Sequence, residues 1–301
     1  MVKQVTECIG NTPLIEIPAG FYNSNNKIFV KLEEFNLGGS VKSRAAYQMI
    51  IDAEENGTIN PLNANITTII EPTGGNTGIG IAQICALRGY RCILVVPDNY
   101  SKIRVRILKA LGAEIVLSDS RTGNDSHIRK ALEIHNDNPS FVMLDQFSNS
   151  SNPKAHYLHT GPEIINCINS NIDFFVAGIG TGGTISGVGR AIKEYYPLSK
   201  VFAVQPEGCD VLNGFAIPHI IQGIAIGQIP KVLDRDIVDG VLDVKESDVI
   251  EVQKRLSKEL GLFLGYSSAA NICASINLST IVGYDKTIVT ISPDGGKNYE
   301  I

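Results

Sequence analysis

The chain of 301 residues contains no tryptophan, and its six cysteines never occur in the CxxC spacing of metal sites and redox pairs. A disulfide framework is not expected either, because such frameworks belong mostly to much smaller secreted domains. No apolar run approaches the roughly 18 residues of a membrane span, and the N-terminal segment lacks the apolar core of a signal peptide. We therefore expect a cytoplasmic protein with reduced cysteines.

Positive and negative charges are nearly balanced, with 26 Lys and Arg residues against 31 Asp and Glu residues. The formal net charge is -5, and no basic cluster is present, so there is no electrostatic basis for binding a nucleic acid. His156 and His159 have a spacing that invites a metal hypothesis. Without a third ligand nearby, we expect packing or surface roles for both and predict no metal. The predicted partner is a small molecule, with no nucleic acid and no membrane.

What the sequence does contain is a regular alternation of short apolar segments and amphipathic segments. Strands are predicted at 27–32, 66–70, 92–96, 115–117, 141–144, 174–177, 201–204 and 287–291. Helices are predicted at 41–56, 76–88, 101–111, 126–135, 185–195 and 247–260. Nearly all-apolar strands separated by helices favour parallel sheets with both faces covered. The predicted class is α/β, with two domains of mostly parallel sheets flanked by helices.

Lys42 lies in the segment GGSVKSR, between a predicted strand and a predicted helix. A positive charge at a helix N-terminus is unfavourable against the helix dipole, so a purely structural lysine is not expected there. A desolvated amine at this position could have a lowered pKa and form an imine with an aldehyde. A solvated surface lysine is the alternative.

A second segment, Glu71–Gly80 (EPTGGNTGIG), follows a predicted strand and opens a predicted helix. We call it the carboxylate loop. Its glycines let backbone N–H groups approach an anion, and the helix N-terminus adds partial positive charge. Thr73, Asn76 and Thr77 supply side-chain donors that suit a carboxylate. A plain glycine-rich strand-to-helix turn is the alternative.

A third segment, Gly178–Gly187 (GIGTGGTISG), also follows an apolar strand and precedes a helix; we call it the phosphate loop. Successive glycine amides and two threonine hydroxyls at a helix start form a cradle for a phosphate. The segment matches GxGxxG, but a dinucleotide site needs that pattern in a first strand–helix unit with an acidic residue about 20 positions later. Here the pattern lies past mid-chain. The next predicted strand, 201–204, contains no acidic residue, and the first one after it is Glu207, which argues against NAD. No Lys-Ser/Thr pair follows the glycines, so a P-loop is excluded.

A reactive lysine, a carboxylate loop and a phosphate cradle together favour a small phosphorylated aldehyde cofactor acting on an amino acid, and pyridoxal 5'-phosphate satisfies all three. The chain also resembles the cysteine synthase and cystathionine β-synthase family of fold-type II pyridoxal-phosphate enzymes. The resemblance is carried nearly end to end by Ile9–Leu14, Lys31–Asn36, Gly39–Lys42, Glu71–Thr73, Gly75–Gly78, Asp145–Phe147, Gly161–Ile164, Ala177–Thr184, Gln222–Ile224, Ser267–Ser268 and Pro293–Asp294.

This resemblance implies a role for each matching position. Lys42 would hold the cofactor as a Schiff base and move the substrate's α-proton. Asn76 would bond to the ring hydroxyl oxygen, and Ser267 would face the pyridine nitrogen. The phosphate would be bound by Gly180, Thr181, Gly182, Gly183 and Thr184. The substrate would contact Thr73, Gly74, Thr77, Gln146 and the backbone of Gly223.

A neutral serine at the pyridine nitrogen makes the ring a weaker electron sink than an aspartate would, which favours β-elimination over transamination. The resemblance therefore implies β-replacement on a serine-derived amino acid through an α-aminoacrylate, with Lys42 as base and then acid. The leading hypothesis is O-acetylserine plus sulfide giving L-cysteine plus acetate. Serine, cysteine or phosphoserine could instead react with a thiol or amine, giving cystathionine, lanthionine or 2,3-diaminopropionate-type products, or cysteine could release hydrogen sulfide. A non-enzymatic regulatory homologue is the least favoured alternative.

Several positions depart from the family's usual pattern, and they leave the donor and the nucleophile open. Leu37 and Ser43 replace a proline and an aspartate around Lys42, changes that we expect to affect the scaffold, whereas Gly74 removes a serine hydroxyl from the carboxylate loop beside the substrate. Ala225 and Ala269 stand in place of glycines, and Tyr266 adds bulk near the ring.

The resemblance also implies a tryptophan synthase β-like fold. The larger, cofactor-binding domain would comprise residues 1–38 and 146–301, and the smaller, mobile, substrate-binding domain residues 39–145. Closure of the smaller domain over the substrate carboxylate would exclude water. A homodimer is expected from the resemblance alone.

Overall fold

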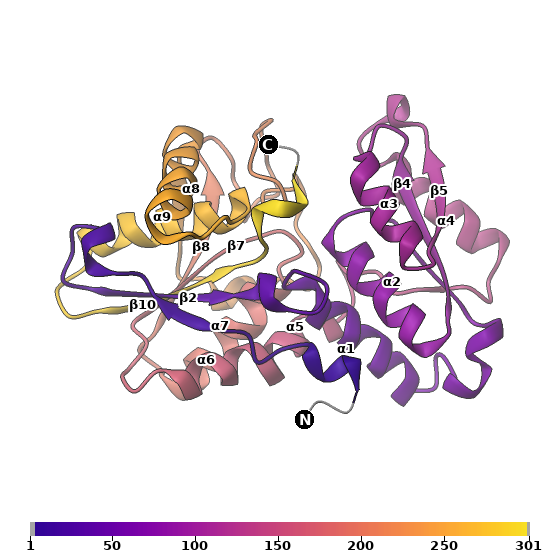
Figure 1. Cartoon of the computed structure of the whole chain (residues 1–301), viewed down its shortest axis with the longest axis horizontal. Coiled ribbons are helices and arrows are strands. Elements are labelled where there is room, and N and C mark those ends of the chain that lie inside the picture. The colour runs from indigo at the N-terminus through magenta and orange to yellow at the C-terminus, as the bar shows by residue number, and fades with distance from the viewer. Residues whose placement is uncertain (1–3, 300–301) are drawn as a thin grey trace. The chain divides into compact units, whose positions relative to one another are not determined.

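The computed structural model describes residues 4–299, so the first three and last two residues of the predicted larger domain lie outside the described part. The chain divides into two compact units (Figure 1). Unit 1 contains the residues up to Val41 and from Asn152 onward, and unit 2 is Lys42–Ser151. The chain therefore leaves unit 1 once, builds unit 2 and returns.

Unit 1 is built on a six-stranded sheet with the order β1-β2-β10-β7-β8-β9. Its strands are β1 (Leu14–Glu16), β2 (Lys27–Leu32), β7 (Phe174–Gly178), β8 (Lys200–Pro206), β9 (Gly240–Val244) and β10 (Thr287–Ser292). Only the β1–β2 pair is antiparallel. Parallel neighbours need crossover connections. Helix α7 (Gly183–Tyr195) connects β7 to β8, whereas residues 207–239, which connect β8 to β9, form a long loop with one short 3-10 helix at Arg235–Ile237.

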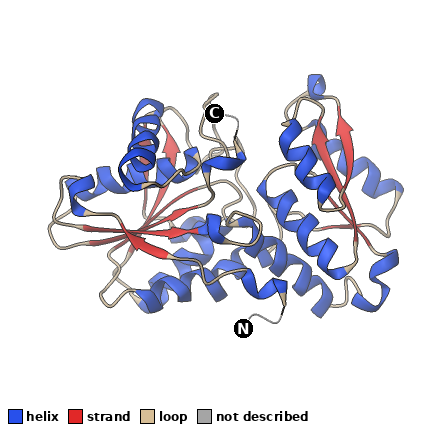
Figure 2. Cartoon of the chain, in the orientation of Figure 1, coloured by secondary structure: helices blue, strands red, loops and turns tan. Residues whose placement is uncertain are grey.

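Helices cover both faces of this sheet (Figure 2). One face packs against α9 (Tyr266–Ile281), with α8 (Glu246–Leu260) beside it, and the other packs against α7 (Gly183–Tyr195). Before α7 lie α5 (Ser151–Ala155), a π-helical turn (His156–Thr160) and α6 (Gly161–Cys167). In β7, Val176 belongs to the core on the α9 side, whereas Phe175 and Ala177 belong to the core on the α7 side. Alternate residues of a strand point to opposite faces, so a sheet covered on both faces needs apolar residues throughout.

Unit 2 contains a four-stranded parallel sheet with the order β5-β4-β3-β6. The strands are β3 (Thr68–Glu71), β4 (Arg91–Pro97), β5 (Glu114–Ser118) and β6 (Val142–Met143), and the helices are α1 (Lys42–Glu55), α2 (Asn76–Arg88), α3 (Lys102–Ala110) and α4 (Ser126–Asp137). In β4, Ile93 and Val95 share a core cluster with Ala131 of α4. Leu94, on the opposite face, lies against α2 at Gly78.

The predicted α/β class, with mostly parallel sheets flanked by helices, is confirmed. The strand predicted at 66–70 begins later, at Thr68, because residues Pro61–Ile66 form a 3-10 helix instead. Within residues 4–299, no helix has both the length and the apolar character needed to cross a membrane.

Candidate functional site

The two glycine-rich loops predicted to bind ligands follow the carboxyl ends of parallel strands. In unit 1 the phosphate loop starts at the end of β7, and Pro293 and Asp294 follow the neighbouring β10. In unit 2 the carboxylate loop starts at the end of β3, and Asp145 and Gln146 follow the neighbouring β6. Open α/β sheets bind their ligands at this edge.

Lys42 is the first residue of α1 and is half-buried. The backbone just before it is fixed to the end of β10. The Val41 N–H donates to the Pro293 carbonyl oxygen at 2.8 Å, and Ser40 forms an antiparallel bridge with Asp294. Val41, to which Lys42 is covalently joined, is therefore held at the sheet edge from which the phosphate loop starts.

A close contact between α1 and α2 lies beside Lys42. A Cβ added at Gly80 would come within 2.9 Å of the Ala46 Cβ and 3.1 Å of the Lys42 carbonyl oxygen. Glycine is therefore needed at residue 80 for the two helices to pack this closely. Because Gly80 is about one turn into α2, which begins at Asn76, Lys42 lies near the start of both helices.

The structure brings together two of the side chains predicted to bind a carboxylate, Thr77 of the carboxylate loop and Gln146, which follows β6. The Thr77 hydroxyl donates to Gln146 Oε1 at 2.6 Å, across 69 residues of sequence. The Thr73 hydroxyl oxygen accepts the Gly75 N–H at 3.4 Å, which bends the loop toward the start of α2. Both Thr77 and Gln146 are buried.

Glu71, the last residue of β3, holds the segment after β6 in place. Its two carboxylate oxygens accept the backbone N–H groups of Asp145 at 3.0 Å and Gln146 at 3.1 Å. Burial raises the pKa of Glu71 to about 7, against the lowering effect of these two bonds. Glu71 belongs to the motif recognised in the sequence, but its positioning role was not predicted, because the only local signal for it is an acidic residue that ends an apolar strand.

The phosphate loop has the geometry of an anion cradle at the start of α7, with the N-cap Gly182 at φ +82°. A Cβ at Gly183 would lie 2.1 Å from Asn152 Oδ1, and one at Gly180 would lie 2.2 Å from the Gly223 carbonyl oxygen. Asn152 Nδ2 also donates to the Thr181 hydroxyl oxygen at 3.0 Å. The loop thus combines glycine amides with positioned hydroxyls, which fits the phosphate of pyridoxal phosphate.

His156 supports this loop from the π-helical turn. The ring is fully buried, with Nδ1 3.0 Å from the Thr160 hydroxyl oxygen and Nε2 3.3 Å from that of Thr184. The predicted packing role for His156 is therefore found, but its contact with the phosphate loop was missed. Nothing in the local sequence points to Thr184, which lies 28 residues away. Among the described residues, no group of three or more His, Cys, Asp or Glu side chains could hold a metal ion.

Ser267 is the second residue of α9 and is buried. The helix is fixed one turn further on by Asn271, whose Oδ1 accepts the Gly178 N–H at 2.8 Å and whose Nδ2 donates to the Ile291 carbonyl oxygen at 2.8 Å. Asn271 therefore connects the ends of β7 and β10. As a result, Ser267 lies at the edge where the phosphate loop begins, and Asn271 is a second positioning residue that sequence reasoning missed.

The departures from the family pattern differ in their surroundings. Ala225 has φ +50°, a region that costs a non-glycine residue about 1 kcal/mol, and its N–H donates to the Ile179 carbonyl oxygen at 2.9 Å. Ala269 is a buried core residue of α9, and Tyr266 packs against the same core. Ser43 is buried in α1. Gly74 lies against the side chains of Val96 and Tyr100.

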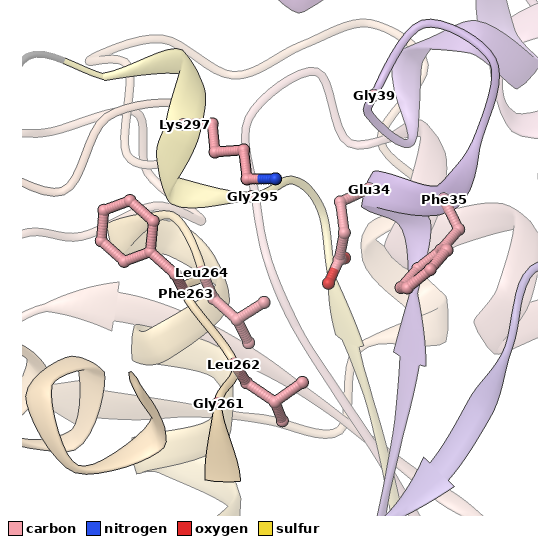
Figure 3. Close-up of a pocket in the computed structure, with 9 residues that line it drawn as sticks. All are labelled: Glu34, Phe35, Gly39, Gly261, Leu262, Phe263, Leu264, Gly295 and Lys297. Carbon is pink, nitrogen blue, oxygen red and sulfur yellow. The ribbon is translucent and has the colours of Figure 1, made fainter. Parts of the chain in front are cut away.

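A pocket of about 350 Å³ lies in unit 1 outside these loops (Figure 3). It is lined by Glu34, Phe35, Gly39, Gly261, Leu262, Phe263, Leu264, Gly295 and Lys297. The Glu34 carboxylate accepts the Ser292 hydroxyl at 2.9 Å, and burial raises the pKa of Glu34 to about 6. None of the predicted site residues lines this pocket.

Known proteins resemble this chain over its whole length. The family described as pyridoxal-phosphate dependent enzyme matches residues 5–294. A cysteine synthase of Staphylococcus aureus is 41% identical over 300 residues, which cover 99% of this chain and 95% of that protein. The structure of a hydrogen sulfide-producing enzyme from Fusobacterium nucleatum has a TM-score of 0.92 and 38% identity, covering 100% of this chain and 98% of its own. An O-acetylserine dependent cystathionine beta-synthase from Helicobacter pylori has a TM-score of 0.92 and 34% identity, with 99% and 97% covered.

These matches span both sheets, the phosphate loop and the carboxylate loop, and the cofactor that the sequence predicted is the one that defines the matching family. The chain belongs to the family of pyridoxal-phosphate dependent enzymes.

Proposed function

We propose that this enzyme catalyses β-replacement on a serine-derived amino acid, with O-acetylserine as donor, sulfide as nucleophile, and L-cysteine and acetate as products. The single observation that supports this most is the pairing of Thr77 with Gln146 in the unit that also begins with Lys42. Thr77 lies in the first turn of α2, and Lys42 is the first residue of the adjacent helix α1. The pairing therefore offers a carboxylate site close to the lysine amine. The 41% identity to a cysteine synthase supports the choice of donor and nucleophile.

The residues proposed to hold the cofactor come from four segments. Lys42 would bind it covalently, Asn76 would bond to its ring hydroxyl, and Ser267 would face its pyridine nitrogen. Its phosphate would be bound by Gly180, Thr181, Gly182, Gly183 and Thr184. When bound, pyridoxal phosphate supplies the electron sink that acidifies the α-proton of an amino acid.

The reaction then needs a base, a fixed carboxylate and exclusion of water. Lys42 Nζ would accept the α-proton and later return it, a role that suits a half-buried amine. Thr73, Gly74 and Thr77, with Gln146 and the Gly223 backbone, would bind and orient the substrate. The uncharged Ser267 hydroxyl would keep the cofactor ring a moderate electron sink, which favours loss of the β-substituent.

The domain roles and assembly belong to the same proposal. The cofactor-binding domain, predicted at residues 1–38 and 146–301, would correspond to unit 1, and the mobile substrate-binding domain, predicted at residues 39–145, would correspond to unit 2, whose bounds are Lys42–Ser151. We propose a homodimer located in the cytoplasm. Size-exclusion chromatography with light scattering measures the mass of the assembly. A measured mass of 32.5 kDa, which is that of one chain, would contradict the homodimer.

A second candidate function uses the same residues with another nucleophile or donor. The similarity to a hydrogen sulfide-producing enzyme and to a cystathionine beta-synthase supports it. In that case cysteine or serine would serve as donor, and a thiol or an amine would replace sulfide.

Visible absorbance of the purified holoenzyme separates these candidates. O-acetylserine, phosphoserine, serine and cysteine are added in turn, followed by sulfide, a thiol or an amine, and products are identified by mass. We expect O-acetylserine to change the cofactor band and sulfide to restore it with release of cysteine. Turnover with thiols or amines, but none with O-acetylserine and sulfide, would favour the second candidate.

Covalent attachment is tested without turnover. Borohydride reduction followed by peptide mapping should place the cofactor on Lys42, and K42A should lose both the label and the activity. Lys102 is a matched control, because it also begins a helix of unit 2 and is exposed. K102A should retain the label, and a label on any other lysine of the wild-type enzyme would contradict the assignment.

A further inference from the structure

Tyr100 packs directly onto the carboxylate loop. A Cβ added at Gly74 would come within 2.6 Å of Val96 Cγ1 and 2.7 Å of Tyr100 Cε1. Such approaches do not occur between real side chains, so only glycine fits at residue 74 while Val96 and Tyr100 are in place. The phenol ring occupies the space that a side chain of the loop would otherwise take.

The Tyr100 hydroxyl lies at the start of α2. Its oxygen is 3.5 Å from the position of a Cβ added at Gly75, which is the N-cap of that helix. Gly75 lies in the sequence between Thr73 and Thr77, two residues of the proposed carboxylate site. The phenol oxygen therefore lies where helix N–H groups favour an anion.

Arg104 determines how this hydroxyl can bond. Arg104 lies in the first turn of α3, its side chain is buried, and Nη1 donates to the Tyr100 hydroxyl oxygen at 3.0 Å. A guanidinium has donors and no acceptor. The Tyr100 oxygen therefore accepts in this contact, and the phenol proton points away from Arg104.

We propose that Tyr100 is a substrate-binding residue whose hydroxyl donates a hydrogen bond to the carboxylate of the amino-acid donor, and that Arg104 is a positioning residue that fixes the direction of this bond. The proposal rests on the proposed function for the nature of the ligand. It adds a residue that no pattern in the carboxylate loop reveals, since Tyr100 follows β4 and the loop follows β3. If the ring only filled space beside Gly74, its hydroxyl would be dispensable.

Y100F separates these two roles because it keeps the ring and removes the hydroxyl. Dissociation constants are measured on the holoenzyme from the change in cofactor absorbance with O-acetylserine, serine and cysteine. A hydrogen bond to a charged group is worth about 1.5–3 kcal/mol, so we expect the dissociation constant to rise about 10- to 100-fold. The cofactor band without donor should not change. The control Y284F removes an exposed hydroxyl and should not alter binding.

A double-mutant cycle tests the role of Arg104. R104M should raise the dissociation constant in the wild-type background and have a several-fold smaller effect in the Y100F background, because the bond it directs is then absent. The same fold-change in both backgrounds would assign Arg104 a role independent of Tyr100 and overturn that half of the proposal.

The packing at Gly74 gives a second, independent test. G74S should weaken donor binding at least tenfold in the wild-type background, where its Cβ overlaps the Tyr100 ring. In the Y100A background the contact with Val96 Cγ1 remains but the ring contact is gone, so G74S should weaken donor binding by a clearly smaller factor relative to Y100A alone. Equal tolerance of G74S in both backgrounds would overturn the proposed contact.

These readouts keep the two proposals apart. Donor binding is measured without any nucleophile, so the inference is tested on whichever donor changes the cofactor band of the wild-type enzyme. Failure of sulfide as a nucleophile would remove the leading function and leave the inference intact. An equal dissociation constant for wild type and Y100F, with the responding donor, would remove the inference and leave the function intact.

Discussion

Glu71 makes the stability of this enzyme depend on pH in a way that one substitution can isolate. Its side chain is 1% exposed and is fixed by the backbone N–H groups of Asp145 and Gln146. E71Q keeps the shape of the side chain and one acceptor oxygen, but it cannot ionise. The variant therefore stands for a permanently neutral residue at this position.

The sign of the effect follows from the raised pKa. The pKa of Glu71 is about 7 in the folded protein and 4.5 is its ordinary value, so between these pH values the folded state binds more protons than the unfolded chain. The free energy of unfolding therefore falls as pH rises. The contribution of Glu71 to it is fully present below about pH 4.5 and is lost as pH rises through about 7. At about 1.4 kcal/mol per pKa unit, wild type should lose about 2 to 3 kcal/mol relative to E71Q between roughly pH 5 and pH 8.

The quantity to measure is the difference in free energy of unfolding between wild type and E71Q, from urea titrations followed by circular dichroism. Other groups with raised pKa values, such as Glu34, are present in both proteins and cancel in the difference. E71Q should be close to or below wild type at pH 5 and should gain on it steadily up to pH 8. A difference that stays constant over this range would refute the reasoning, because it would mean that Glu71 does not change its protonation on folding.

Two further substitutions test the supports of unit 1. G183A places a Cβ 2.1 Å from Asn152 Oδ1 and should weaken pyridoxal-phosphate binding at least tenfold in equilibrium dialysis. The control G283A, whose Cβ has no neighbour within 4 Å, should not weaken it. Equal binding by both variants would contradict the geometry of the phosphate loop. K31M removes an ammonium that lies 2.7 Å from Glu163 and is 1% exposed, and it should lower the free energy of unfolding by about 3 kcal/mol or more. K286M breaks a pair in which the lysine side chain is 40% exposed and should cost about 1 kcal/mol or less, so similar losses from the two lysines would contradict the effect of burial.

The elements with a clear period or clear boundaries could be predicted from the sequence. α2 was predicted at 76–88 and lies there, because a glycine-rich loop precedes it and Gly89, at φ +80°, ends it. β2 was predicted at 27–32 and is found with the same bounds. The lysine of GGSVKSR was predicted near a helix start, and it is the first residue of α1.

Other elements have no such signal. α9 was not predicted, because it is buried around most of its circumference and its apolar residues therefore do not lie on one face. β1 has only three residues, and β9, an edge strand, contains a glycine and an aspartate. The insertion of β10 between β2 and β7 pairs strands more than a hundred residues apart, which a local period does not reveal.

The candidate site shows the same division between the residues proposed to bind ligands and the residues that support them. Glycine-rich loops can be recognised because close approach to an anion restricts the residue type at successive positions. Their supports are single polar residues from elsewhere: Glu71 for Gln146, Asn152 and His156 for the phosphate loop, and Asn271 for the start of that loop. A lone asparagine, histidine or glutamate is ordinary in a sequence, and only the fold makes it buried and directs it at one loop.

That burial has a thermodynamic cost, and the cost explains where these residues occur. A buried polar side chain is tolerated when its hydrogen bonds are made. When the buried side chain is ionisable, its pKa shifts in the direction that favours the neutral form. Glu71 shows the second effect, while Asn271 shows the first, with both ends of its amide bonded to strand ends. Both residues fix the carboxyl edge of a parallel sheet, where the strands end and no ladder hydrogen bonds remain to hold the backbone. The polar side chains replace the missing ladder, and they hold in one conformation the loops that a bound cofactor and substrate require.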